Sequence, residues 1–149
     1  MENIISGSDF IAYLKTLNPE DWDEKATEKW TVKDVVAHMV GWEKEDAQII
    51  GSIWKSKKAP WFYETNDYDD FNKKSVEHYK DYTPSQLIGE WEKWRRAVEK
   101  EISRIGEDKM KARPDLFGWL FKKRDDDHYN HHYRQIRKTV SSKNGSTRR

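Results

Sequence analysis

The sequence predicts an all-helical bundle. Apolar residues recur at intervals of three and four over most of the chain, and the alternation typical of strands is nearly absent. Thr31 and Thr83 each stand where a helix is expected to begin. Eight Trp, seven Tyr and five Phe among 149 residues supply much of the area that one core can bury. We therefore expect one domain over residues 1–140, followed by a disordered tail over residues 141–149, which has nothing to bury.

The first two helices are predicted from their ends and their apolar faces. The first is expected at 9–17 and ends near Asn18, because a proline follows directly and disrupts a helix interior; its apolar side is Phe10, Leu14 and Leu17. A connector with Trp22 leads to Thr31, an N-cap with Asp34 in a capping-box position. The second helix then extends to about Lys55. Its predicted buried face has the spacing of a helix and consists of Val32, Val35, Val36, Met39, Trp42, Ile49 and Ile53.

A loop and a third helix are predicted next. Residues 55–64 are expected to form a loop that exposes three aromatic side chains, Trp61, Phe62 and Tyr63. The third helix is expected at 67–79. Its buried residues should be Tyr68, Phe71, Ser75 and Tyr79.

The fourth helix has the clearest signals. Thr83 suits the cap and Pro84 the first helical position, and an apolar stripe continues to Gly106: Leu87, Trp91, Trp94, Val98, Ile102 and Ile105. A loop through Pro114 follows, and one last helix that carries several histidines is expected to end at about Val140.

Composition excludes several classes of protein. Charged residues make up 37% of the chain but the net charge is only +1, so the signs are mixed and a nucleic-acid partner is not expected. The absence of cysteine excludes disulfides and thiolate metal sites. No apolar stretch approaches the roughly 20 residues that span a bilayer, and the N-terminus does not have the pattern of a signal peptide. We therefore expect a cytoplasmic protein that does not bind membranes.

A cluster of histidines on the last helix indicates a metal site. His128 and His132 are four residues apart, so both imidazoles project from one helix face and can donate to the same divalent ion. His131 points about 100° away from His132; it is the rival ligand, because it would pair with His128 at three-residue spacing. A chance HxxxH on an ordinary helix is the alternative interpretation.

His38 supplies the third candidate ligand. It lies at the margin of the apolar stripe of the second helix, where a lone histidine is usually a partly buried side chain that is hydrogen-bonded to a carboxylate. The functional interpretation makes it a metal ligand, with Asp34 or Glu45 accepting from its other nitrogen and fixing its tautomer. His78, near the end of the third helix, is expected at the surface.

The order and spacing of three segments resemble the DinB-like superfamily. Residues 30–43 (WTVKDVVAHMVGWE) resemble the helix-two signature of that superfamily. Residues 70–85 (DFNKKSVEHYKDYTPS) are similar to its ClbS/DfsB branch, and residues 128–136 (HYNHHYRQI) match its C-terminal HxxxH turn. The resemblance extends over roughly residues 8–140.

The resemblance implies a four-helix bundle of up-down-down-up topology and a divalent metal held by His38, His128 and His132. It also implies a homodimer, since family members are often dimers. Characterised relatives include thiol-dependent transferases and isomerases, and a ClbS-type hydrolase that disarms a reactive cyclopropane in a genotoxin. This chain departs from the family pattern at Gly7, which shortens the first helix, and at Tyr133-Arg134, where a small residue usually precedes the Gln.

These observations predict a metal-dependent enzyme that acts on a small electrophile, by hydrolysis or by thiol transfer, in detoxification or stress protection. Zinc or nickel suits three imidazoles, ferrous iron would also bind, and a low-molecular-weight thiol is a candidate cosubstrate. Trp42, Trp61 and Tyr63 are the expected apolar wall for the substrate. Glu45 and Asp127 are the candidate catalytic bases. The alternative is a non-catalytic stress protein of the ClbS/DfsB type that binds a ligand or genotoxin.

Overall fold

The computed structural model describes residues 6–65, 67–125 and 127–147; the side chains at 122–125, 127–128 and 143–147 lie outside its described part. The described residues form no strand, which confirms the predicted all-α class. In chain order the elements are α1 (Gly7–Leu14), η1 (Pro19–Asp23), α2 (Val32–Ser56), η2 (Trp61–Tyr63), α3 (Asp69–His78), α4 (Pro84–Ile105), α5 (Glu107–Lys111), α6 (Pro114–Asp125) and α7 (Asp127–Thr147).

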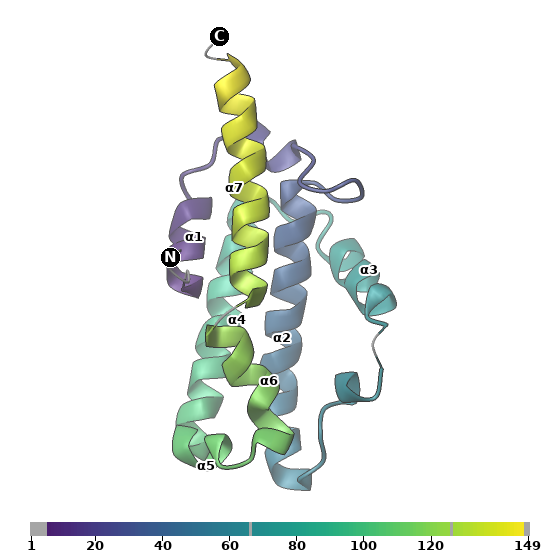
Figure 1. Cartoon of the computed structure of the whole chain (residues 1–149), viewed down its shortest axis with the longest axis vertical. Helices are drawn as coiled ribbons and strands as arrows, with labels where there is room; N and C mark the ends of the chain where they lie inside the picture. The colour runs from purple at the N-terminus through teal and green to yellow at the C-terminus, as the bar shows by residue number, and fades with distance from the viewer. Residues whose placement is uncertain (1–5, 66, 126, 148–149) are drawn as a thin grey trace.

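Two long helices, α2 and α4, form the centre of the bundle and lie side by side over most of their length (Figure 1). α7 packs along one half of this pair, and α6 packs along the other half, so the two helices in series cover the same side. α1 contacts α4 and α7, whereas α3 lies against α2 on the opposite flank. No helix in the described ranges is long and apolar enough to cross a membrane.

Both predicted helix starts are confirmed by capping boxes. Thr31 Oγ1 accepts the N–H of Asp34 at 3.1 Å, and an Asp34 carboxylate oxygen accepts the N–H of Thr31 at 3.1 Å. Thr83 and Gln86 exchange the same two bonds, at 3.1 and 2.8 Å, with Pro84 at the first helical position. Each pair satisfies two backbone donors that a helix N-terminus otherwise leaves without partners.

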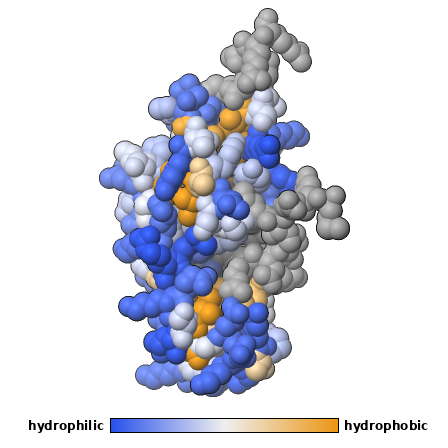
Figure 2. Space-filling view, turned by 90° about the vertical axis from the view of Figure 1, so that its left-hand side faces the viewer, coloured by the Kyte–Doolittle hydropathy of each residue, from blue (hydrophilic) through white to orange (hydrophobic). Residues whose placement is uncertain are grey.

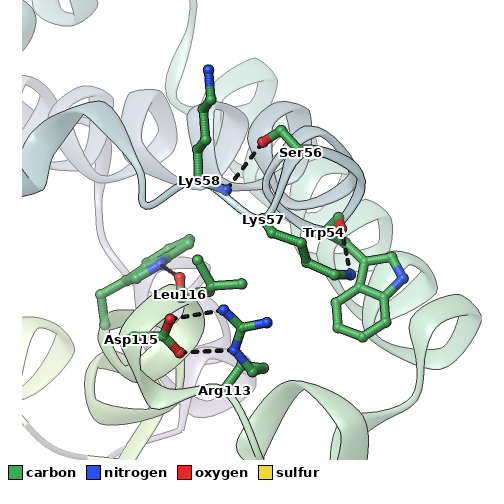
Figure 3. A network of polar contacts seen from close by, with 8 residues as sticks. Trp54, Ser56, Lys57, Lys58, Arg113, Asp115 and Leu116 are labelled. Carbon is green, nitrogen blue, oxygen red and sulfur yellow. Dashed lines mark hydrogen bonds and ion pairs between the residues drawn. The ribbon is translucent and has the colours of Figure 1, made fainter.

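The end of α2 is fixed by Lys57, which takes the left-handed backbone conformation at φ 57° (Figure 3). Its ammonium donates to the carbonyl of Trp54 at 2.6 Å and lies over the indole ring, 3.1 Å from its centroid. Nearby, Arg113 and Asp115 form a two-bond ion pair at 3.0 and 2.9 Å where α6 begins. These contacts close the end of the bundle that lies away from α7.

The core has two clusters of buried residues, one at each end of the α2–α4 pair. The cluster under α1, α3 and α7 includes Phe10, Val36, Met39, Trp91 and Ile136. The cluster under α5 and α6 includes Ile50, Ile102, Met110, Phe117 and Leu120. On the side that Figure 2 faces, hydrophobic residues appear as separate spots among hydrophilic ones.

Several expectations about the elements and their buried residues were wrong: the first helix, for example, is Gly7–Leu14 instead of 9–17. The loop predicted through Pro114 contains α5, and α6 and α7 replace the single last helix, which extends to Thr147 instead of ending near Val140. Phe62 is buried (9% exposed) instead of exposed, because its ring packs edge-on against Trp119 at 5.0 Å. On α2, Ile50 is fully buried although the predicted stripe placed Ile49 there.

Candidate metal centre

Two histidines from opposite ends of the sequence meet inside the bundle. His38 lies in the second turn of α2 and His132 in the second turn of α7, and their ring centroids are 5.0 Å apart at an interplanar angle of 77°. Both side chains are buried, with 6% and 9% of their surface exposed. The structure therefore brings together two of the three predicted ligands.

The Nδ1 atom of His38 contacts an amide, not a carboxylate. It lies 3.0 Å from Oδ1 of Asn72, which belongs to α3, and the Trp30 ring packs against the imidazole at 5.1 Å. The carboxylates expected to fill this place have other partners: Asp34 accepts from its capping threonine, and Glu45 accepts from an indole. The expectation of Asp34 or Glu45 as the acceptor at this nitrogen is therefore corrected to Asn72.

The burial of His132 favours the neutral form of its imidazole. Burial lowers the pKa of His132 below its usual value of 6.5. The hydrogen bond between its Nδ1 and Oε1 of Gln135, 3.0 Å long, raises the pKa and so opposes the effect of burial. Neighbouring His131 lowers the pKa further. A neutral imidazole retains the nitrogen lone pair that a metal ligand needs.

His128 begins the same helix but its side chain lies outside the described residues, as does that of Asp127. In α7, four-residue spacing places the positions of His128 and His132 on one face. Among the side chains that the structure describes, no group of three or more potential ligands forms. The role of His128 as third ligand stays a prediction.

The two remaining histidines lie at the surface. The His131 side chain is exposed and its ring is 4.9 Å from that of His132. His78 is exposed at the end of α3, as expected, and packs edge-on against Tyr79 at 4.6 Å.

A buried pair that the sequence did not predict fixes the start of α7 against α2. The hydroxyl of Tyr129 donates to Glu43 at 2.8 Å, and both side chains are buried. Burial raises the pKa of Tyr129 well above its usual value, and the adjacent Glu43 carboxylate raises it further. The sequence does carry a signal for this pair, because Glu43 is a carboxylate within the apolar stripe of α2. It lies one turn after the buried Val40 and one turn before Ala47.

The predicted substrate wall belongs to a group of aromatic rings that pack against one another. Trp42 and Trp61 stack at 5.9 Å with 15° between their planes, and Phe71 contacts Trp42 at 4.2 Å. Trp61 is 38% exposed, and its Nε1 donates to Glu45 at 2.7 Å. Tyr63 is 48% exposed and packs on Phe62 instead of on either tryptophan.

The described residues fit a divalent metal ion through two ligands. His38 and His132 are buried and their rings pack edge to face, and the Nδ1 of each contacts an amide oxygen, the kind of outer contact that orients a metal-bound imidazole. Nitrogen donors of this type suit zinc, nickel and ferrous iron.

Comparison with protein-family models gives a match to the DinB superfamily over residues 5–125, most of the chain. The match includes α2 with His38 and α3 with Asn72, and it ends just before α7. No curated protein and no solved structure matches the chain at a significant level.

Proposed function

This chain belongs to the DinB superfamily, and on that premise we propose that it is a divalent-metal-dependent enzyme that acts on a small electrophile by hydrolysis or thiol transfer. The observation that carries the proposal is the approach of His38 and His132 to a ring distance of 5.0 Å within the bundle. Histidine is intermediate among residue types in how often it is buried, and groups with perturbed pKa values cluster at functional sites. Here two buried histidine rings pack edge to face.

In this proposal His38 and His132 hold the ion, and His128 completes the set from the first turn of α7. When bound, zinc or nickel supplies a Lewis acid that polarises an electrophile and lowers the pKa of water or of a thiol. The neutral imidazoles leave the charge of the ion uncompensated, which favours that chemistry.

The protein's own residues prepare the site in three ways. Burial lowers the pKa of His132, because desolvation disfavours its charged form, and so favours the neutral imidazole. The Trp30 ring covers His38 and excludes water from that side. Trp61, stacked on Trp42 and partly exposed, offers an apolar face to a substrate.

Glu45 is the candidate base whose surroundings are described. Its carboxylate accepts from Trp61, so it lies beside the proposed substrate wall. To accept a proton from a substrate or nucleophile, Glu45 would use its other oxygen or release the indole N–H. Asp127 stays the second candidate base.

A screen of metal-loaded protein against thiol transfer and hydrolysis of electrophiles tests this function. We expect turnover that a chelator abolishes and that His38→Ala loses, while His78→Ala, a change at an exposed histidine, retains it. Saturable binding of a substrate without any turnover, in protein that carries its metal, would contradict the enzyme and favour a ligand-binding stress protein.

A further inference from the structure

We propose that Asn72 is a positioning residue that holds His38 as the Nδ1–H tautomer, and that Trp42 in turn fixes the orientation of Asn72. Two bonds carry the proposal: His38 Nδ1 to Asn72 Oδ1 at 3.0 Å, and Trp42 Nε1 to the same oxygen at 2.8 Å. The tautomer follows from these bonds alone. Its effect on metal affinity rests on the function proposed above.

The first step is the orientation of the amide. An indole N–H is a donor and has no acceptor lone pair, so whatever it bonds must be an acceptor. Trp42 therefore requires the oxygen of Asn72, and not its NH₂ group, at this place. The opposite orientation of the amide would set two donors against each other in a partly buried position.

The orientation of the Asn72 amide then determines which nitrogen of His38 carries the proton. The same oxygen has a second lone pair, and His38 Nδ1 lies within bonding distance of it. Because an oxygen acceptor requires a donor, the proton of the neutral ring must be on Nδ1. The lone pair is then on Nε2, which becomes the nitrogen that donates to a metal.

The helices hold these three residues in place. His38 and Trp42 are one turn apart on α2, so their side chains leave the same face. α3 brings Asn72 to that face because it approaches α2 closely at Gly41: a Cβ there would lie 2.5 Å from Cβ of Ser75. Gly41 precedes Trp42 in the chain, and Ser75 lies one turn after Asn72 on α3, so this contact sets the distance between Trp42 and Asn72.

The surroundings of Trp42 suit a residue that acts through Asn72. Its ring is packed against four aromatic rings, those of Trp61, Phe62, Tyr68 and Phe71. These contacts leave the indole one orientation, with its N–H directed at the amide oxygen. Trp42 thus gains a role in addition to that of a substrate wall.

The direct test is the tautomer of His38, measured by ¹⁵N NMR of the imidazole nitrogens in metal-free protein at about pH 9, where ordinary histidines are neutral. Wild-type protein should show a protonated Nδ1 and an unprotonated Nε2. Asn72→Leu, which keeps the size but removes the acceptor, should shift the proton toward Nε2, and Trp42→Phe should do so in part. Asn72→Asp, which keeps an acceptor oxygen, should restore the wild-type pattern.

A matched control is Trp61→Phe, which removes an indole N–H from the same aromatic group without touching Asn72; the tautomer of His38 should not change. Circular dichroism shows whether each variant is folded. A wild-type His38 that carries its proton on Nε2, or a folded Asn72→Leu protein with the wild-type pattern, would overturn the proposal.

The effect of the His38 tautomer on metal binding is measured as zinc affinity, by competition with a chromophoric zinc chelator. Asn72→Leu and Trp42→Phe should bind zinc about 10–100-fold more weakly than wild type, and Trp61→Phe within about twofold. Equal affinity in all four proteins would overturn the positioning role. If wild-type protein binds no zinc but shows the Nδ1–H tautomer, the proposed function fails and the assignment of Asn72 stands.

Discussion

At the scale of single residues, the polar side chains inside this bundle each require a partner, because an unpaired polar group loses its hydration on burial. His132 finds Gln135 one turn along its own helix, and Tyr129 finds Glu43 across the bundle. Tyr79 differs: its hydroxyl is buried, and the described residues offer it no hydrogen-bond partner of good geometry.

Tyr79 gives a prediction about stability at high pH. Burial, with the nearby Glu90 carboxylate adding to it, raises the pKa of Tyr79 far above its usual 10.0. Below pH 10 the residue is neutral in both the folded and the unfolded state. Above pH 10 the unfolded chain releases this proton more readily than the folded chain does, so the free energy of unfolding falls as the pH rises.

Tyr79→Phe should therefore leave the free energy of unfolding unchanged or slightly higher at neutral pH. Above pH 10 the free energy of unfolding of this variant should fall less steeply than that of wild type. The two slopes should differ by up to about 1.4 kcal/mol per pH unit. Urea unfolding at neutral pH and at about pH 11 measures both. Equal slopes for the two proteins would show that the hydroxyl ionises freely in the folded state.

The sequence alone located His38 and His132 but not Asn72. The histidines stand in helical periodicities that can be followed residue by residue, so their faces were predictable. The partner of His38 comes from α3, and no local pattern says which residue of α3 will face α2. Asp34 and Glu45 are at suitable spacing on the same helix, but capping and the indole of Trp61 use their carboxylates.

At the scale of elements, the caps and one close contact between helices decide where α2, α3 and α4 lie. Thr83 closes the N-terminus of α4 with two bonds. Thr83→Ala should lower the free energy of unfolding by about 1 kcal/mol, because the N–H of Gln86 loses its acceptor. Ser85→Ala, an exposed change two residues later, is the control and should stay within about 0.5 kcal/mol of wild type in urea unfolding.

Replacing two helical glycines, Gly41 and Gly89, by alanine should change the stability of the protein in opposite directions. At Gly89 an added Cβ meets nothing within 4 Å, so Gly89→Ala should stabilise the protein by about 0.5–1 kcal/mol through helix propensity. At Gly41 the Cβ would overlap Ser75, so Gly41→Ala should destabilise the protein despite the same gain in propensity. Thermal unfolding of both variants checks this pair. A stabilising Gly41→Ala would mean that α3 does not approach α2 as closely as described.

The elements between residues 106 and 126 were the least predictable. The sequence around Pro114 predicts a loop, whereas Pro114 occupies the first position of α6, where its missing N–H is no loss. α5 has only five residues, too few for a periodicity to appear. The long helices α2 and α4 were predictable because periodicity and caps agree along their whole length.

At the scale of the whole molecule, the proposed centre connects the two ends of the chain. His38 belongs to the core pair of helices, and His132 to α7, which the family match does not include. The all-helical class and the superfamily were predictable from the order of the motifs. The up-down-down-up four-helix topology, the third ligand and the dimer stay predictions. The third ligand depends on His128, and the dimer depends on contacts beyond one chain.

A metal that bridges α2 and α7 should stabilise the folded protein. By linkage, free zinc at a hundred times its Kd adds about 2.7 kcal/mol to the free energy of unfolding. We expect the Tm to rise by several degrees with zinc in wild type and in His78→Ala, and to stay constant in His38→Ala. A calorimetric scan of metal-free and zinc-loaded protein measures this. An equal rise in all three proteins would place the ion elsewhere.

The metal content of the purified protein is the sharpest test of a metal ion bound by His38 and His132. Elemental analysis should be performed on wild type without a His-tag and on His38→Ala, His132→Ala and His78→Ala, with circular dichroism to show that each is folded. We expect about one divalent ion per chain in wild type and in His78→Ala, and a large loss of metal in the other two variants. Unchanged stoichiometric metal in folded His38→Ala and His132→Ala would contradict this expectation.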